Sequence, residues 1–268
     1  MRRVKRETAA IGRPRSRANR PSVKGIQSSC EWRGTLFLTP DRLTRASLTP
    51  AVAALRPSEY TAALIYAIQR DPELVRGKHV LELGSGSGVV LAAAAQLGAS
   101  HVCGVDIEED AVLASQRLLT DLGHGDKAEF HVGDLWQPLG SRRFDTILAN
   151  LPHFPMNDGT VPGRRSTWSV GGPDGRRLLD RFIDELPQRL QPGGRAIITH
   201  NGFVDTALSR LLLASHGLKL AVLHSILVPL AEEKMARVSK ALIESETNRS
   251  LHQYGPYSFG EVYIVEIS

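Results

Sequence analysis

The feature that most constrains this chain is a glycine-rich turn in residues 79–95, HVLELGSGSGVVLAAAA. Three glycines, Gly84, Gly86 and Gly88, separate an apolar, strand-like run from an alanine-rich, helix-like run. Glycine permits positive φ angles and lets a ligand approach the backbone closely, and the start of the helix offers free N–H groups. The pattern therefore predicts a strand, a tight turn and a helix that together bind a ligand.

The spacing of this loop excludes two nucleotide-binding patterns. The dinucleotide fingerprint G-x-G-x-x-G would need a glycine where Val89 stands, and a phosphate-binding P-loop would need Gly-Lys followed by Ser or Thr. The observed spacing is E-x-G-x-G-x-G, which begins at Glu82. Taken alone, such a loop also fits an ordinary tight turn.

Two further strand-like runs end in an aspartate. Asp106 stands twenty-two residues after Gly84, and a carboxylate at that strand end can accept hydrogen bonds from two ribose hydroxyls. Asp134 ends the next run and is followed by Leu135 and Trp136, a setting that suits an adenine amine with its ring between apolar side chains. Either aspartate alone also fits a helix cap. Three successive strand ends with these residues favour a nucleoside site.

The remaining pattern predicts an α/β fold, a doubly wound, seven-stranded, mostly parallel sheet with helices on both faces and an antiparallel last strand. The expected strands are 79–83, 101–105, 128–132, 144–149, 195–199, 218–228 and 262–267, and the expected helices are 57–70, 89–97, 109–122, 177–190 and 204–216. Because no capped helical pattern separates the last two strands, we expect them to form an antiparallel pair at the sheet edge.

The positive charge is concentrated at the N-terminus. Residues 1–25 hold seven arginines and two lysines against one glutamate, a net charge of +8, so residues 26–268 carry −3 of the overall +5. Because this segment has almost no large apolar side chains, we expect a disordered basic tail. Three interpretations stay open: an arm that contacts RNA, a ribosome or an acidic partner, an organelle transit peptide, and a solvated leader.

Cysteine use and hydropathy bound the cellular setting. Cys30 and Cys103, the two cysteines of the chain, lie 73 positions apart with no CxxC or Cys/His cluster, which argues against a disulfide scaffold and a cysteine-based zinc site. We expect no metal. No run approaches the roughly 18 apolar residues of a membrane span, and the N-terminus lacks the apolar stretch of a secretory signal. The expected location is cytoplasmic, without a membrane partner.

On these motifs the chain resembles the class I S-adenosylmethionine-dependent methyltransferases. The resemblance extends over about residues 55–268 and rests on the glycine loop with Glu82, on Asp106 and on Asp134. It implies a Rossmann-like methyltransferase fold and S-adenosylmethionine as the cofactor. It also implies that Glu82 and the loop hold the amino-acid end of the cofactor, that Asp106 holds the ribose, and that Asp134 with Leu135 holds the adenine.

The run 144–149 ends in Asn150-Leu151-Pro152-His153, which resembles the N-P-P-Y element of methyltransferases that modify amide and exocyclic amine nitrogens. There, the Asn side-chain carbonyl and a following backbone carbonyl accept the two hydrogens of the nitrogen and aim its lone pair at the methyl group. The resemblance implies a catalytic Asn150, with Leu151 and Pro152 beside the substrate. For His153 three roles stay open: stacking on the substrate, acting as a base, or lying on a surface loop.

Two more segments narrow the resemblance to the HemK/PrmC-like release-factor glutamine methyltransferases. Arg56–Ile68 resembles the P-S-E-D-T helix start of that group, and Gly171–Arg176 (GGPDGR) resembles its G-G-x-D-G segment. Both segments also fit plain helix caps, with Ser58 as the first cap. The long stretch 152–172 is expected to form a substrate lid in which Trp168 contacts the substrate.

The sequence thus predicts a methyltransferase domain over residues 26–268, with a substrate-side extension over 26–77. The segment 231–256 is expected to add a helix, either beside the site or packed for stability. The expected reaction is transfer of a methyl group to an amide or amine nitrogen, as in a protein glutamine. The alternatives are a small-metabolite acceptor, another reaction that consumes S-adenosylmethionine, and a non-enzymatic accessory that binds RNA or a ribosome through the tail.

Overall fold

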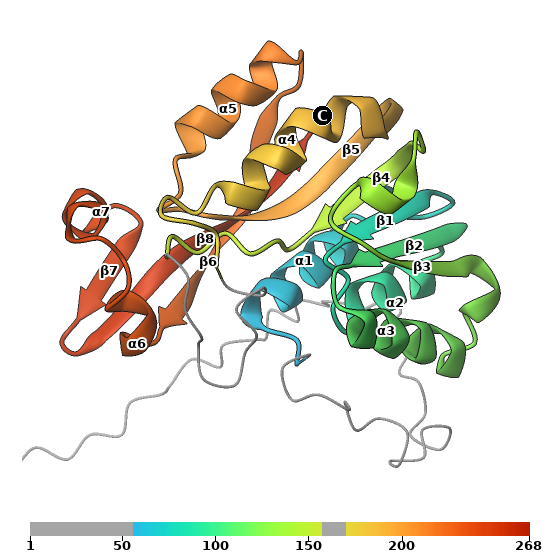
Figure 1. The fold of residues 1–268 in the computed structure, drawn as a ribbon, viewed down its shortest axis with the longest axis horizontal. Coiled ribbons are helices and arrows are strands. Elements are labelled where there is room, and N and C mark those ends of the chain that lie inside the picture. The colour runs from blue at the N-terminus through green and yellow to red at the C-terminus, as the bar shows by residue number, and fades with distance from the viewer. Residues whose placement is uncertain (1–55, 157–169) are drawn as a thin grey trace, which may run out of the picture. The chain divides into compact units, whose positions relative to one another are not determined.

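The structure is a computed structural model that describes residues 56–156 and 170–268 (Figure 1). The predicted basic tail 1–25 lies outside the described residues. So do residues 26–55 of the substrate-side extension and most of the expected lid, including Trp168. In the described ranges, no helix combines the length and the hydropathy that a bilayer crossing requires.

One eight-stranded sheet organises the described residues (Figure 1). Its strand order is β3-β2-β1-β4-β5-β8-β6, and β7 pairs with β8 off this path. The strands are β1 His79–Leu83, β2 His101–Asp106, β3 Ala128–Val132, β4 Phe144–Ala149, β5 Leu190–Asn201, β6 Leu220–Leu230, β7 Leu251–Tyr254 and β8 Tyr257–Ile267. The first five strands run parallel to one another, whereas β8 is antiparallel to β5, β6 and β7. The predicted mostly parallel sheet is confirmed.

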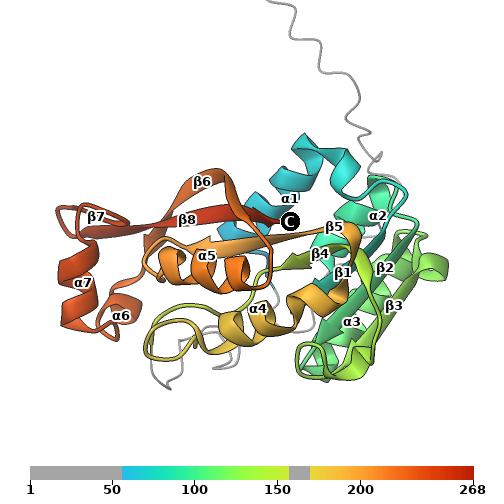
Figure 2. The ribbon, with the colours of Figure 1, turned by 90° about the horizontal axis from the view of Figure 1, so that it is seen from above.

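Helices cover both faces of the sheet (Figures 1 and 2). The first three, α1 Glu59–Arg70, α2 Val89–Gln96 and α3 Glu109–Asp121, pack on one face, and α4 Arg177–Arg189 and α5 Thr206–Ser215 pack on the other. Two short helices, α6 Glu232–Met235 and α7 Lys240–Glu246, lie beside β7. A separate apolar core fills each side, around Leu64 and Leu91 under α1 and α2, and around Phe182 under α4.

The parallel half of the sheet explains the apolar runs of the sequence. Leu81 in β1 lies opposite Cys103 in β2 and Ile147 in β4, and all three side chains are fully buried. A parallel strand with helices on both sides is buried on both faces, so its residues form a continuous apolar run. This is why the sequence predicted β1 and β4 with the bounds that the structure has.

The C-terminal quarter differs from the prediction in one respect. The last two predicted strands form the expected antiparallel pair at the sheet edge, because β8 pairs with β6, which ends the strand order. The segment 231–256, for which a helix was expected, contains α6, α7 and also β7, so the sheet has eight strands rather than the expected seven. A turn at Gly255, with φ of +60°, joins β7 to β8. The Gly-Pro pair at Gly255 and Pro256 is a turn signal from which this hairpin could have been predicted.

The turn after β1 requires glycine at Gly88, directly before α2. Its φ is +74°, and a Cβ atom there would lie 2.8 Å from the Cα of Ser115 in α3. The Ser115 hydroxyl also donates a hydrogen bond to the carbonyl oxygen of Gly86 at 3.1 Å. Close packing between the loop and α3 is therefore what excludes a side chain at this position.

Replacing Gly88 with alanine should lower the free energy of unfolding by more than the backbone strain of a positive φ angle alone would. Gly123 is a matched control because its φ is +76° but nothing lies within 4 Å of its missing Cβ. We expect Gly123→Ala to lower the free energy of unfolding by about 1–2 kcal/mol. Gly88→Ala should lower it by about 1–3 kcal/mol more, because the Ser115 backbone must move. Urea unfolding measures both, and equal losses would contradict the packing argument.

Candidate functional site

The carboxyl ends of β1, β2, β3 and β4 meet at a pocket of about 360 Å³. The strand order reverses between β1 and β4, and ligands of open α/β sheets bind at such a reversal. Residues predicted from all four strand ends line the pocket: Glu82, Gly84, Gly86, Asp106, Asp134, Leu135, Asn150, Leu151 and Pro152. Gly88 and His153 do not line it, and Trp168 is outside the described residues.

Glu82 is buried in the pocket wall with one oxygen unsatisfied. The residue is 2% exposed, and its Oε2 has no hydrogen-bond partner among the described residues. Burial raises the pKa of this carboxyl well above its ordinary value of 4.5, and the nearby charge of Asp106 raises it further. A buried, unsatisfied oxygen costs free energy. A ligand group that carries N–H donors or a positive charge would therefore be favoured next to Glu82.

Asp106 is held by backbone N–H groups. Its Oδ2 accepts from the Gly86 N–H at 2.8 Å, and its Oδ1 accepts from the Glu108 N–H at 3.0 Å. Burial raises the pKa of Asp106, while these two hydrogen bonds act in the opposite direction. Each carboxylate oxygen has a second lone pair. Asp106 can therefore still accept hydrogen bonds from two hydroxyl groups of a ligand.

Asp134 forms an ion pair with Arg181 of α4 across the pocket lining. The Arg181 Nη2 lies 2.9 Å from Oδ2, and Nη1 lies 3.3 Å from Oδ1. A carboxylate offers about four lone-pair positions, so two remain for a ligand. The next residue, Leu135, has a positive φ of 49° and a buried side chain in the pocket wall. Such a conformation costs about 1–2 kcal/mol for a residue other than glycine, which the packing at this turn must offset.

Asn150 follows β4 and reaches the pocket with its side chain anchored. The Thr199 hydroxyl of β5 donates a hydrogen bond to Asn150 Oδ1 at 2.8 Å. Leu151 lines the same pocket and is 7% exposed. The Asn150 side chain thus presents an acceptor oxygen at a fixed place beside the residues that follow β1 and β2.

His153 lies behind the pocket wall rather than in it. The residue is 4% exposed, which makes the surface-loop interpretation wrong. Its Nδ1 hydrogen-bonds to the carbonyl oxygen of Leu151, and its ring meets the Tyr60 ring edge-on, with 6.1 Å between the ring centres. Burial lowers the pKa of His153 to about 4, so the ring is neutral near pH 7. The pocket lining gives no geometric support for stacking on a ligand or for a base at this residue.

The segment Gly171–Arg176 packs against this loop from behind. Gly175 has φ of +79°, and a Cβ there would lie 2.7 Å from the carbonyl oxygen of His153. The Gly171 N–H donates to the carbonyl oxygen of Phe154 at 2.9 Å. Asp174 Oδ1 accepts from the Arg176 N–H at 3.0 Å, but the N-cap residue of α4 is Arg176, not this aspartate. The G-G-x-D-G pattern therefore serves close backbone packing against the Asn150–His153 loop.

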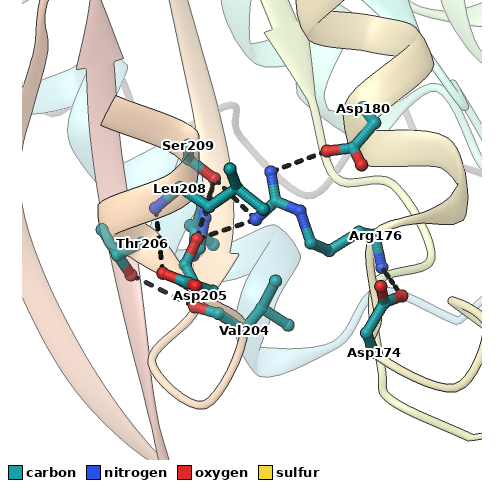
Figure 3. A network of polar contacts seen from close by, with 9 residues as sticks. Asp174, Arg176, Asp180, Val204, Asp205, Thr206, Leu208 and Ser209 are labelled. Carbon is teal, nitrogen blue, oxygen red and sulfur yellow. Dashed lines mark hydrogen bonds and ion pairs between the residues drawn. The ribbon is translucent and has the colours of Figure 1, made fainter. Parts of the chain in front are cut away.

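Arg176 joins the starts of α4 and α5 (Figure 3). Its side chain, 4% exposed, donates to the carbonyl oxygen of Asp205 at 2.7 Å, to the Ser209 hydroxyl at 3.1 Å and to Asp180 at 2.6 Å. The Ser209 hydroxyl also lies 3.0 Å from Nε2 of the buried His200 in β5. This network links the starts of α4 and α5 to β5, and none of its members lines the pocket.

Several pocket residues were missed from the sequence. Arg56, Ser58 and Thr61, at the start of α1, line the pocket, as do Arg177 and Arg181 of α4. The two α4 arginines are four residues apart, which places both on one helix face, so the spacing was an available signal. Thr199 had no signal, because only the pairing of β4 with β5 brings it beside Asn150.

A cluster of metal-ligand type also escaped the sequence analysis. Cys103, Glu129 and His131 place their ligand atoms within 4.8 Å of one another, and no other such group occurs among the residues that the structure describes. The register of β2 and β3, which sets Cys103 opposite Glu129, creates it. Arg142 already forms an ion pair with Glu129, and burial raises the pKa of Cys103 to about 12. The cluster lies outside the pocket lining.

Comparison with known proteins identifies the class. A family model described as a methyltransferase domain matches residues 74–242, more than half of the chain. The chain therefore belongs to this family of methyltransferase domains.

Two sequence relatives and one solved structure show how far the similarity extends. The chain is 34% identical over 160 residues to a Methanocaldococcus jannaschii protein that carries the name of a protein N5-glutamine methyltransferase, covering 59% of this chain and 79% of that one. It is 31% identical over 186 residues to the release factor glutamine methyltransferase of Geobacter sulfurreducens, covering 66% of this chain and 60% of that one. The chain thus spans about three fifths of this bacterial relative.

The solved structure is the Thermus thermophilus 16S rRNA N2 G1207 methyltransferase in complex with AdoMet and guanosine. Its TM-score is 0.50 at 22% identity, covering 79% of this chain and 43% of that one. At this identity the likeness shows the fold alone.

The buried His200 makes the stability of the fold depend on pH. Burial lowers its pKa from 6.5 to about 4. Between pH 6.5 and about pH 4 the histidine binds a proton in the unfolded chain but not in the folded chain. Protonation therefore favours the unfolded chain, and the free energy of unfolding decreases as the pH falls through this range. From pH 7 to pH 5 the loss is about 2 kcal/mol. Urea unfolding of wild type and His200→Gln should show a difference in stability that shrinks by this amount on acidification. A constant difference would contradict the assignment.

Proposed function

We propose that the pocket binds S-adenosylmethionine and that the chain transfers its methyl group to the side-chain amide nitrogen of a protein glutamine. The observation that carries the proposal is the meeting of Glu82, Asp106, Asp134 and Asn150, from four strand ends, at one pocket. Membership of the methyltransferase domain family supports the reaction class. The names of the two relatives support a glutamine as the acceptor.

The residues present fit the cofactor. The unsatisfied Oε2 of Glu82 suits its ammonium group, and Asp106 keeps free lone pairs for the ribose hydroxyls. Asp134, with Leu135, would hold the adenine amine and ring while still paired with Arg181. The pocket volume of about 360 Å³ lies in the range of small-molecule sites, roughly 300–1,000 Å³. When bound, the cofactor supplies an electrophilic methyl group on a sulfonium.

The protein side of the reaction is positioning. An amide nitrogen is a weak nucleophile because its lone pair is delocalised, so its orientation matters most. Asn150 Oδ1 and the Leu151 carbonyl would accept the two N–H groups of the glutamine amide and direct the nitrogen at the methyl carbon. The nitrogen would bond to the methyl carbon as the carbon–sulfur bond breaks, with the electron pair staying on sulfur, so that S-adenosylhomocysteine would leave as a neutral thioether. The nitrogen would give up one of its two protons to water, so the product keeps one N–H.

The other partners and the location stay predictions from the sequence. A basic arm that contacts RNA or a ribosome would involve residues 1–25, and a cytoplasmic location agrees with the reaction partners in the names of the relatives. A small-molecule acceptor is the rival within the same chemistry. Incubating purified protein with cell extract and methyl-labelled cofactor separates these candidates, because the label enters protein, RNA or a small molecule.

Binding of the cofactor should release a proton from Glu82. Its raised pKa means that the free protein holds this proton to a higher pH than an ordinary glutamate would, whereas a bound ammonium group favours the carboxylate, so affinity should fall as the pH falls. Calorimetry at pH 6 in buffers of different ionisation enthalpy measures the released proton. We expect Glu82→Gln to bind at least about tenfold more weakly and to lose the proton release.

A matched control for this substitution is Glu73→Gln, because Glu73 is an exposed glutamate paired with Arg76 away from the pocket. This variant should bind as wild type does. Equal proton release by wild type and Glu82→Gln, or tighter binding of a nicotinamide dinucleotide than of S-adenosylmethionine, would contradict the proposal.

Asn150→Ala should separate binding from chemistry. The cofactor dissociation constant should change by less than about twofold, while kcat should fall by about 100-fold, the scale of losing one preorganised polar group at a reacting centre. The readout is labelled methyl on glutamine, located by mass spectrometry of digested protein. Wild-type turnover by Asn150→Ala on the identified acceptor would remove the amide assignment.

A further inference from the structure

The two oxygens that would grip the methyl acceptor each already receive a hydrogen bond from a buried side chain. Asn150 Oδ1 accepts from the Thr199 hydroxyl at 2.8 Å. The Leu151 carbonyl oxygen is hydrogen-bonded to Nδ1 of His153. Thr199 is 3% exposed and His153 is 4% exposed, and neither residue lines the pocket. Both donors therefore approach from behind the wall that the acceptor would face.

We propose that Thr199 and His153 are positioning residues that fix the directions of these two acceptor oxygens. The inference rests on the proposed function, in which Asn150 Oδ1 and the Leu151 carbonyl bind one amide nitrogen. A carbonyl oxygen has two lone pairs that lie near the plane of its substituents. With one lone pair occupied from behind, the other has a set direction toward the pocket.

The sheet places Thr199 for this role. The parallel register of β4 and β5 sets Ala149 beside Ile198, so Asn150 and Thr199 are the next residues along the two strands. A free asparagine side chain can turn about two bonds and exchange its oxygen with its NH₂ group. In the orientation that the structure shows, the oxygen, not the NH₂ group, faces the Thr199 hydroxyl and accepts its hydrogen bond.

The hydrogen bond to the Leu151 carbonyl oxygen holds His153 in one tautomer. A carbonyl oxygen only accepts, so the proton must reside on Nδ1 when this atom bonds to Leu151. The backbone of His153 is fixed as well, because its carbonyl oxygen accepts from Asn201 Nδ2 at 3.1 Å, and Asn201 Oδ1 accepts from the Tyr60 hydroxyl at 3.1 Å. The histidine at the place of the N-P-P-Y tyrosine thus points back at the loop.

Kinetics of Thr199 variants test the first half of the proposal. We expect Thr199→Val to lower kcat about tenfold with KM for the cofactor changed less than twofold, as for the loss of one hydrogen bond used at the reacting centre. Thr199→Ser restores the hydroxyl and should regain most of the lost rate. Equal rates for wild type and Thr199→Val, or equal losses for Val and Ser, would overturn the assignment.

Thr146→Val is the matched control. Thr146 is also a fully buried strand threonine, in β4, and its hydroxyl donates to the carbonyl oxygen of Leu74 outside the pocket lining. The control should lower the melting temperature and leave kcat within about twofold of wild type. A matching fall in kcat for Thr146→Val would mean that any lost buried hydroxyl slows the enzyme.

Two substitutions of His153 test the second half. His153→Leu removes the donor, whereas His153→Asn puts an NH₂ group where Nδ1 lies but cannot titrate near pH 7. We expect His153→Leu to lose about tenfold in kcat and His153→Asn to recover most of it. Both variants could instead lose activity and also lose an ionisation near neutral pH from the rate profile. That result would assign a base role to His153 and overturn the positioning role.

A readout without turnover keeps this inference separate from the proposed function. NMR of protein labelled with ¹⁵N should show His153 as a neutral Nδ1–H ring and the Asn150 side-chain NH₂ as one sharp, distinct pair of signals. Thr199→Val should broaden or shift that pair, and Thr146→Val should not. If the wild-type protein labels no glutamine, the proposed function fails, and the NMR spectra alone then test the positioning roles of Thr199 and His153. An Nε2–H tautomer, or an Asn150 signal unmoved by Thr199→Val, overturns the positioning roles.

Discussion

The hydrogen bond from the Gly86 N–H to Asp106 ties the loop after β1 to the end of β2, and the pocket is arranged around this contact. The same loop packs against α3 at Gly88, where a side chain would collide with Ser115. Glu82, near the end of β1, is shielded from water in the pocket wall and lies close to the Asp106 carboxyl. Backbone packing thus determines the electrostatics of this end of the site.

The opposite end of the pocket, at Asn150, depends on polar and close-packing contacts from residues that do not line the pocket. The Asn150–His153 loop has no regular secondary structure, so its backbone groups need partners from elsewhere. Asn201 supplies one partner, the segment before α4 packs closely at Gly175, and Arg176 joins that segment to α5 (Figure 3). A loop fixed in this way can present two acceptor oxygens with little reorganisation, which is the requirement for catalysis by orientation.

The sequence predicted the residues at the carboxyl ends of the parallel strands, since continuous apolar runs and glycine turns report directly on buried strands and their ends. Glu82, Asp106, Asp134 and Asn150 all line the pocket. It did not predict contacts that depend on register between strands, such as Thr199 with Asn150 or Cys103 with Glu129. The sequence also could not predict the direction of the His153 side chain, because the motif gives only the position of the residue and tertiary packing decides where the side chain points. The β7 hairpin was missed although a Gly-Pro turn signalled it.

The pocket contains buried carboxyl groups whose burial costs free energy, and a suitable ligand would reduce this cost. Glu82 has a buried, unsatisfied oxygen, and the carboxyls of Glu82 and Asp106 lie close together with raised pKa values. Any group that binds the folded state and not the unfolded chain adds its binding free energy to stability. A cationic ligand with hydroxyls would satisfy Glu82 and Asp106 together, because its positive charge would offset the burial and the nearby Asp106 charge that raise the pKa of Glu82. The free-energy cost of burying these carboxyls and the selectivity for such a ligand therefore have the same physical origin.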